Sequence, residues 1–251
     1  MVAIVYCLER QFESIEAVLF DKDGTLANSE TFLRSLAQKR SRLIDAQVPG
    51  VQEPLLMAFG VEGDRINPGG LMAVGSRQDS EIAAAAYVAE TGKDWITALE
   101  IVHSAFAEAD SHQLSKTEKA EQTPPFAGIV ECLRRLSASG LKLGIISADT
   151  TENIQAFVAQ CGLANIIHLS LGSDRPDLAK PNPAFFQAAC YQLGVRCENT
   201  LSVGDAASDL QMARQAKAAA FVGVSWGWSQ PVRLAGADSL IHQPEQLQVR
   251  V

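Results

Sequence analysis

The sequence predicts an α/β protein in which a doubly wound parallel sheet carries an inserted all-helical domain. Several short segments are almost continuously apolar, which is typical of strands buried on both faces of a parallel sheet. Helix-length segments with apolar residues at three- and four-residue spacing separate them. A stretch from about residue 27 to residue 122 contains helical patterns and no convincing strand. It is far longer than an ordinary crossover between strands, so it is predicted to be a separate helical cap.

The elements follow in order along the chain. The predicted strands are residues 17–20, 141–147, 166–171, 200–204, 219–224 and 239–241. The predicted helices between them are residues 127–139, 151–161, 183–193 and 209–217, and the cap has helical patterns at residues 30–46 and 80–91. Residues 2–14 are predicted to form a short hairpin against the sheet edge. Residues 1–26 and 124–251 would then form the sheet domain and residues 27–123 the cap, with the polar run 111–123 and the following two prolines as the return hinge.

Composition narrows the class of protein. The 251 residues contain 21 Lys plus Arg and 29 Asp plus Glu, which gives a net charge of −8. This balance argues against binding to nucleic acid or to an anionic membrane, because both need a positive surface. No apolar run approaches the roughly 18 residues of a membrane span, and the five cysteines are widely spaced and form no C-x-x-C motif. A soluble cytoplasmic protein with free thiols is expected, and nothing here indicates an oligomeric state.

Two acidic residues follow the first predicted core strand. Asp21 and Asp23 lie in the sequence DKDGTL, directly after the apolar residues 17–20. A carboxylate at the end of a buried strand needs a cation or hydrogen bonds to offset its burial. Paired carboxylates suit a hard divalent cation such as Mg²⁺, which prefers oxygen ligands. The alternative is an ordinary Asp-Gly turn with solvated charges.

Two further polar residues have positions that suit an anionic ligand. Ser147 ends the strand at residues 141–147, where its hydroxyl and the following backbone N–H groups could hold a phosphate oxygen. The alternative is a helix N-cap, which Asp149 or Thr150 could supply as well. Lys180 lies in the loop DRPDLAKPNP, whose three prolines could direct its ammonium group into a pocket. A solvated loop charge is the alternative for this lysine.

A second acidic pair follows the strand at residues 200–204. Asp205 comes directly after the strand in the sequence GDAASD, and Asp209 lies one helical turn further on, on the same side. Together with the earlier residues, this pair completes a set of four acids, one lysine and one serine. Such a set contains the groups that metal-assisted phosphoryl transfer requires.

These residues carry a family resemblance over residues 15–227. The chain resembles the haloacid dehalogenase superfamily of hydrolases, most closely its phosphoglycolate-phosphatase-like branch, which has a Rossmann-like core and a helical cap after the first motif. DKDGTL matches motif I, Ser147 motif II, Lys180 in KPNPAFF motif III and GDAASD motif IV, and VSWG resembles a further segment of the family. Ala148-Asp149 departs from the asparagine that many relatives carry soon after motif II.

The resemblance implies a phosphoric monoester hydrolase that acts on a small phosphorylated metabolite. Asp21 would attack phosphorus and form an aspartyl-phosphate. Asp23 would protonate the leaving alcohol and then take a proton from the hydrolytic water. Lys180 would neutralise charge shared by the nucleophile and the phosphoryl group.

The resemblance also implies a metal ligand set and a phosphate-binding set. Mg²⁺ would be held by Asp21, the backbone carbonyl of Asp23, Asp205 and Asp209, the last directly or through water. The phosphoryl oxygens would be positioned by Ser147 and by N–H groups near Gly24 and Ala148. The cofactor expected is therefore Mg²⁺.

Substrate choice would lie in the cap. Arg65 and Arg77 could reach an anionic leaving group, although surface arginines on cap helices are the commoner situation. The first substrate to consider is 2-phosphoglycolate. A phosphomutase is one alternative. Sugar-phosphate mutases of the superfamily that the chain resembles carry a cap histidine shortly after motif I, and the absence of any histidine before His103 disfavours this activity. A non-catalytic binding relative is the other, since a fold does not guarantee activity.

Overall fold

A parallel sheet lies at the centre of the larger part of the molecule. The computed structural model describes residues 2–111, 116–175 and 177–250. Six strands run parallel in the order β10-β9-β8-β3-β6-β7. The predicted α/β class and the six predicted strands are confirmed, with ends that differ by one residue at most. The strands are β3 (Ala17–Phe20), β6 (Lys142–Ser147), β7 (Ile167–Gly172), β8 (Thr200–Gly204), β9 (Ala220–Val224) and β10 (Ser239–Ile241).

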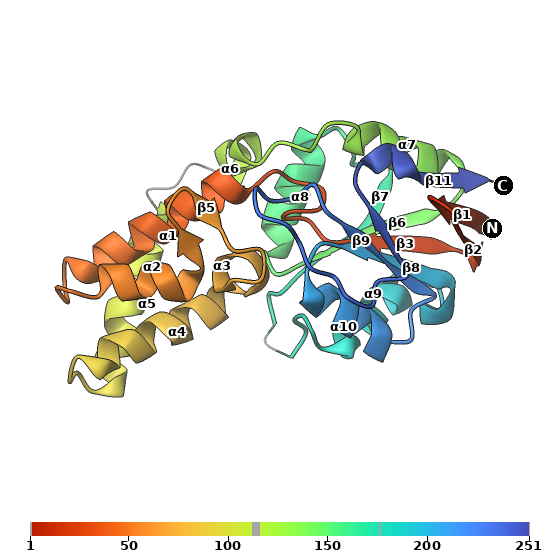
Figure 1. The fold of residues 1–251 in the computed structure, drawn as a ribbon. Coiled ribbons are helices and arrows are strands. Elements are labelled where there is room, and N and C mark those ends of the chain that lie inside the picture. Colours follow the sequence, from red (N-terminus) through yellow and green to blue (C-terminus); the bar gives the residue numbers. More distant parts are fainter. Residues whose placement is uncertain (1, 112–115, 176, 251) are drawn as a thin grey trace.

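Helices cover both faces of this sheet (Figure 1). Strand β3 shows why both faces need cover. Its side chains alternate between two apolar clusters, one on each face of the sheet. Val18 and Phe20 pack in a cluster with residues of α7 (Ile129–Ala138) and α8 (Thr151–Gln160). The intervening residues of the strand pack with α9 (Pro183–Leu193) and α10 (Ala207–Gln215) on the other face. A strand buried on both faces has no polar position, which accounts for its continuous apolar sequence.

The segment between β3 and β6 is mostly helical and has a core of its own. Phe59 and Phe106 lie at the centre of this core with their rings edge to face, 6.4 Å apart. The prediction that the segment has no strand is wrong. A two-strand hairpin forms in the glycine-rich interruption, where Gly63 takes a positive φ of 63° at the turn. The elements are α1 (Glu30–Asp45), α2 (Gln52–Phe59), β4 (Val61–Glu62), β5 (Arg65–Ile66), α3 (Leu71–Val74), α4 (Arg77–Glu90), α5 (Trp95–Ser111) and α6 (Lys116–Gln122).

The two connections between the helical segment and the sheet lie side by side. Asn28 N donates a hydrogen bond of 2.8 Å to Pro124 O. The polar run predicted as a hinge is partly helical, because α6 occupies its second half and packs against α8. Residues 112–115 of that run lie outside the described residues. The division at residues 27 and 123 stays a prediction.

The chain ends form a second sheet. Strands β1 (Ala3–Cys7) and β2 (Arg10–Ile15) make the predicted hairpin, but β1 pairs on its other side with β11 (Leu247–Arg250). The hairpin thus belongs to a sheet of its own, and β1 lies against β10, the edge strand of the main sheet, where Ser239 Oγ donates to Cys7 O at 3.4 Å. The alternating burial of β1 explains the arrangement, because alternate side chains of the strand enter the apolar cluster below α7.

Two further observations concern the helices and the cysteines. No helix among the described residues is long and apolar enough to cross a membrane. All five cysteines are free thiols, and burial raises the pKa of Cys7 to about 12.

The order of the strands determines where the polar motif residues meet. Strand β3 lies between β6 and β8, so the carboxyl ends of these three strands are neighbours. Asp21 follows β3, Ser147 ends β6 and Asp205 follows β8. In doubly wound sheets, ligands bind at this edge, at the point where the strand order reverses.

Candidate active site

A buried lysine connects two carboxylates at the carboxyl edge of the sheet. Lys180 Nζ donates to Asp21 Oδ1 at 2.5 Å and pairs with Asp209 Oδ1 at 2.7 Å. The lysine side chain is only 4% exposed. Burial alone would lower the pKa of Lys180, but the two carboxylates raise it above its usual value. The proline-rich loop thus brings Lys180 to the acids at the ends of β3 and β8.

Asp205 is fixed beside this pair by two side-chain donors. Thr25 Oγ1 donates to Asp205 Oδ1 at 2.7 Å, and Trp228 Nε1 donates to Asp205 Oδ2 at 2.6 Å. Gly24 permits this contact, because a Cβ at that position would lie 2.6 Å from both Asp205 Oδ2 and Trp228 Nε1. Its positive φ of 78° also favours glycine.

Three of these carboxylates could hold one metal ion. Asp21, Asp205 and Asp209 are buried, and each offers an oxygen within 4.8 Å of the others. Burial and the neighbouring carboxylates raise the pKa of Asp205 to about 6 and that of Asp21 well above its usual value. With Lys180 they form what we call the Lys180 cluster, in which three carboxylates face one ammonium group. This uncompensated charge and the all-oxygen donor set fit a hard divalent cation such as Mg²⁺.

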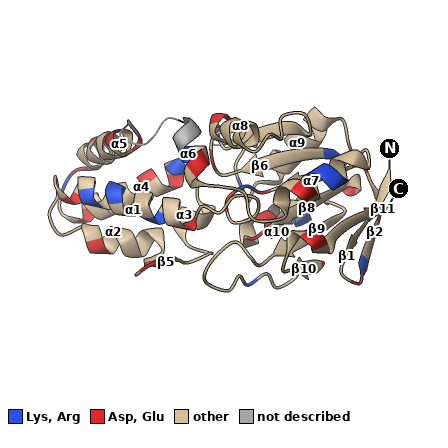
Figure 2. Cartoon of the chain, turned by 90° about the horizontal axis from the view of Figure 1, so that it is seen from above, with Lys and Arg blue, Asp and Glu red and all other residues tan. Residues whose placement is uncertain are grey.

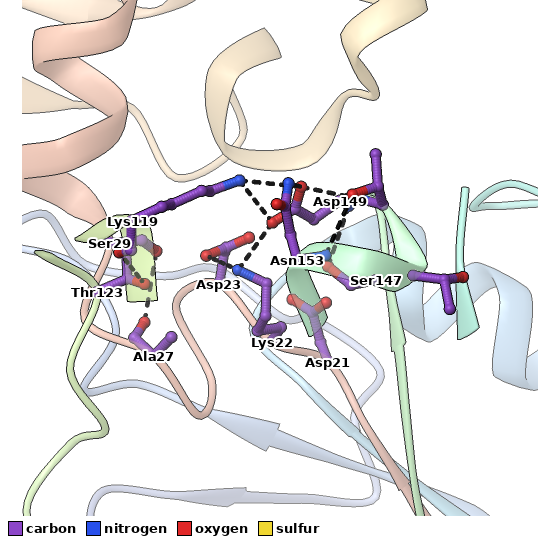
Figure 3. Close-up of polar contacts among 12 residues, drawn as sticks. Asp21, Lys22, Asp23, Ala27, Ser29, Lys119, Thr123, Ser147, Asp149 and Asn153 are labelled. Carbon is purple, nitrogen blue, oxygen red and sulfur yellow. Dashed lines mark hydrogen bonds and ion pairs between the residues drawn. The ribbon is translucent and has the colours of Figure 1, made fainter. Parts of the chain in front are cut away.

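Asp23 has a different environment from the three clustered acids. Its Oδ1 accepts a hydrogen bond of 2.7 Å from Lys22 Nζ. Lys22 also pairs with Asp149 Oδ2 at 3.1 Å, and Asp149 accepts a bond of 2.8 Å from Lys119. Figure 3 shows these four side chains joined by successive polar contacts. We call these four residues the Lys22 cluster. The prediction that Asp23 is a metal ligand concerns its backbone carbonyl and not the side chain described here.

The charges within the Lys22 cluster stabilise one another. Burial alone would lower the pKa of Lys22, but the carboxylates of Asp23 and Asp149 raise it above its usual value. Burial likewise opposes ionisation of Asp149, yet Lys22 and Lys119 lower its pKa below the usual range. Two ammonium groups thus balance two carboxylates.

A small pocket opens over Asp21 between the sheet and the cap. Ser147 and Ala148, both predicted to hold the phosphoryl group, line it, and Ser147 is almost fully buried. Of the predicted N–H groups near Gly24, that of Gly24 itself donates to Ala27 O at 3.1 Å. Helix α3 provides the cap side of the pocket. The lining residues are Asp21, Asp23, Ala73, Val74, Ser147, Ala148, Lys180, Ala206, Ser208 and Asp209.

The two cap arginines do not line this pocket. Arg65 is exposed and lies 3.7 Å from Asp64. Arg77 forms ion pairs with Glu81 at 2.7 Å and Asp110 at 2.9 Å, within the cap. Charged residues of both signs are spread along the cap helices in Figure 2. The structure therefore gives both arginines partners within the cap. His103 lies on the same surface, 3.7 Å from Glu81, and His112 is outside the described residues.

Several residues of the site were not singled out from the sequence. Trp228 is one of them, and its indole N–H donates to Asp205. The Ser208 hydroxyl lines the pocket and has no hydrogen-bond partner in the structure. Its place between the two acids of GDAASD was a usable signal for Ser208. No comparable signal exists for Lys119, which lies 30 positions from its partner Asp149.

Known proteins resemble this chain in sequence and in fold. A protein of Dickeya dadantii named "Probable phosphatase IndB" is 34% identical over 113 residues, which are 45% of this chain and 49% of that protein. This match spans about half the length of the relative. Phosphoglycolate phosphatase of Yersinia pseudotuberculosis is 26% identical over 87% of this chain and 84% of its own. The crystal structure of a hydrolase from Pseudomonas syringae shares the fold, with a TM-score of 0.59 and 24% identity over 91% of this chain and 94% of that one.

A family model covers both clusters and four of the six strands of the main sheet. The model described as haloacid dehalogenase-like hydrolase matches residues 15–217. These residues include every member of both clusters, whereas Trp228, which donates to Asp205, lies outside the matched range. With the six-stranded sheet and the acids at its carboxyl edge, this match assigns the chain to the haloacid dehalogenase-like hydrolase family.

Proposed function

We propose that the protein is a Mg²⁺-dependent phosphatase that hydrolyses a small phosphorylated metabolite through an aspartyl-phosphate intermediate. The observation that carries this proposal is the Lys180 cluster. It combines a buried carboxylate at the floor of a pocket, a lysine in contact with it and two further acids. The similarity to proteins named as phosphatases supports the same reaction class.

Asp21 is the nucleophile in this proposal. Its carboxylate oxygen forms a bond to phosphorus while the bond from phosphorus to the leaving oxygen breaks. Lys180 lies 2.5 Å from that carboxylate and lessens the repulsion between it and the phosphoryl oxygens. Ser147 and Ala148 line the same pocket and would orient the phosphoryl group.

The carboxylates of Asp21, Asp205 and Asp209 would hold Mg²⁺. When bound, the ion supplies Lewis-acid neutralisation of charge on the transferring phosphoryl group. Thr25 and Trp228 occupy one lone pair on each oxygen of Asp205 and so fix its orientation.

Asp23 acts as the general acid and then as the general base in this proposal. In the first step, its carboxyl group gives a proton to the leaving alkoxide oxygen. In the second step, a water oxygen bonds to phosphorus, its proton passes to Asp23, and the bond to Asp21 breaks. Asp23 lines the pocket beside Asp21, so one residue can serve both steps.

The pocket favours a small leaving group. Ala73 and Val74 of α3 form its cap side, and Lys180 is the cation among the described lining residues. We take 2-phosphoglycolate as the first ester to test, because a relative that matches 87% of this chain is named phosphoglycolate phosphatase. The free thiols are consistent with a reducing compartment, so we propose a cytoplasmic location.

The test is a panel of phosphate esters with and without Mg²⁺. We expect Mg²⁺-dependent release of inorganic phosphate, and Asp21→Asn should lower turnover by at least about 1,000-fold. Asp64→Asn, an exposed cap residue, serves as the matched control and should retain turnover. Unchanged turnover in Asp21→Asn would overturn the proposal. Transfer of phosphate to another substrate hydroxyl, with little inorganic phosphate, would assign a phosphomutase instead.

A further inference from the structure

Lys22 is a buried cation that the proposed reaction does not use. Its side chain is 2% exposed and lies between the carboxylates of Asp23 and Asp149, at 2.7 Å and 3.1 Å. Its backbone carbonyl accepts hydrogen bonds from the N–H groups of Leu26 and Ala27, both at 2.8 Å. The residue is therefore fixed at both its backbone and its ammonium group.

Asp149 holds Lys22 from the other side. It accepts hydrogen bonds from Lys119 at 2.8 Å and 3.0 Å, from Asn153 Nδ2 at 2.7 Å and from Thr150 N at 2.9 Å. A carboxylate with this many donors has one orientation. Asp149 follows β6, and Figure 3 shows its carboxylate beside the ammonium group of Lys22.

Lys119 extends the chain of contacts to the cap. It belongs to α6, which precedes α7 and packs against α8, and its ammonium group lies 5.4 Å from the centre of the Phe32 ring in α1. The contacts thus run from the first cap helix to the residue beside the nucleophile.

The contact with Lys22 leaves one oxygen of Asp23 for proton transfer. Asp23 Oδ1 is occupied by the lysine hydrogen bond. Oδ2 can then carry the proton for the leaving group, and later receive one from water. Proton transfer needs a donor oxygen held at hydrogen-bond distance from its target. A carboxyl group without this contact could rotate among several orientations.

We propose that Lys22, held by Asp149 and Lys119, is a positioning residue that orients the carboxyl group of Asp23 for proton transfer. This inference rests on the proposed phosphatase function. In each step the proton moves between Asp23 and substrate or water, and Lys22 keeps its own protons throughout. Through its contact with Phe32, Lys119 links the orientation of Asp23 to the first cap helix.

The experiment compares two leaving groups in single-turnover reactions with the enzyme in excess. p-Nitrophenolate leaves without protonation, whereas an alkoxide needs a proton from Asp23. We expect Lys22→Met to slow release of the alcohol from a short alkyl phosphate by about tenfold or more. Release of p-nitrophenol should slow by less than about threefold. The ratio of the two rates is the readout, because a general loss of structure lowers both rates alike.

Further variants test the chain of contacts. Asp149→Asn should change the ratio in the same direction by a smaller factor, and Lys119→Met by a smaller factor again. Asp149→Asn also keeps the inference testable should Lys22→Met fail to fold. Lys142→Met is the matched control. Lys142 donates a hydrogen bond of 2.6 Å to Leu193 O and does not line the pocket, so this variant should leave the ratio unchanged.

Each outcome has one meaning. An equal loss for both esters, or no loss, in Lys22→Met would overturn the positioning role of Lys22. An unchanged ratio in Asp149→Asn would overturn the part of Asp149, and an unchanged ratio in Lys119→Met the link to the cap. If the wild-type protein hydrolyses neither ester, the proposed function itself fails. Calorimetric titration of each variant with Mg²⁺ alone should give the wild-type affinity, which would establish that the Lys180 cluster is intact.

Discussion

The Lys180 cluster and the Lys22 cluster contain the same kinds of side chain in different proportions. In the first, three carboxylates face one ammonium group. In the second, two carboxylates face two ammonium groups. Both are largely buried, and an uncompensated buried charge is costly. The excess charge of the first cluster is therefore offset only by protons or a further cation, whereas the charges of the second balance one another. The same motif, DKDGTL, contributes one acid to each.

The largest effect should follow removal of the single cation of the Lys180 cluster. Lys180→Met leaves three buried carboxylates close together, and loss of one partner of a buried pair costs about 3 kcal/mol or more. We expect a corresponding fall in the free energy of unfolding of the metal-free protein, measured with urea, and at least about a 100-fold loss of turnover. A change below about 1 kcal/mol would contradict the charge imbalance.

Asp205 provides a test of the same imbalance through pH. Its pKa of about 6 exceeds the usual value near 4. Between these values the folded state binds the proton more tightly than the unfolded state, so this residue lowers stability as pH rises. Asp205→Asn removes that titration. The metal-free variant should therefore gain stability relative to wild type from about pH 4 to about 6.

Mg²⁺ gives the complementary measurement for Asp205. Above pH 6, Mg²⁺ should raise the thermal midpoint of the wild-type protein and have little effect on Asp205→Asn, because the variant lacks one ligand carboxylate. Equal stabilisation of both proteins by Mg²⁺ would argue against Asp205 as a ligand.

Trp228 tests how the Lys180 cluster is oriented. Trp228→Phe removes the hydrogen bond of 2.6 Å to Asp205 but retains most of the ring packing. Loss of a partner that orients a metal ligand typically weakens metal binding about 10-fold or more. We expect this weakening in a calorimetric titration with Mg²⁺. Trp226→Phe is the matched control, because that indole donates to a backbone carbonyl, Thr25 O, instead.

The smallest effect should come from the outer end of the Lys22 cluster. The Lys119 side chain is 21% exposed, so its ion pair with Asp149 is partly screened. Lys119→Met should lower the free energy of unfolding by about 0.5–1 kcal/mol at low salt and by less at high salt. Urea unfolding at two salt concentrations measures this. A loss as large as that of Lys180→Met would mean that the two clusters do not differ as proposed.

The sequence by itself determined the sheet, its strands and the acids that follow them. Parallel strands buried on both faces require continuous apolar runs, and this pattern is local in the sequence. Asp21, Ser147 and Asp205 could be placed together because their strands end at one edge of the sheet. The cap could be inferred as helical, although its short hairpin at β4 and β5 could not.

Only the tertiary structure decided which side chains meet. Lys22 adjoins Asp21 in sequence, yet its partner across the fold is Asp149, and Lys119 reaches the same carboxylate from the cap. Arg77 appeared suited to a substrate anion, but two carboxylates inside the cap hold it. Contacts such as these depend on side-chain direction and on the packing of elements distant in sequence. Periodicity and motif spacing indicate neither side-chain direction nor the packing of distant elements. The balance of charge in each cluster could therefore be determined only from the folded chain.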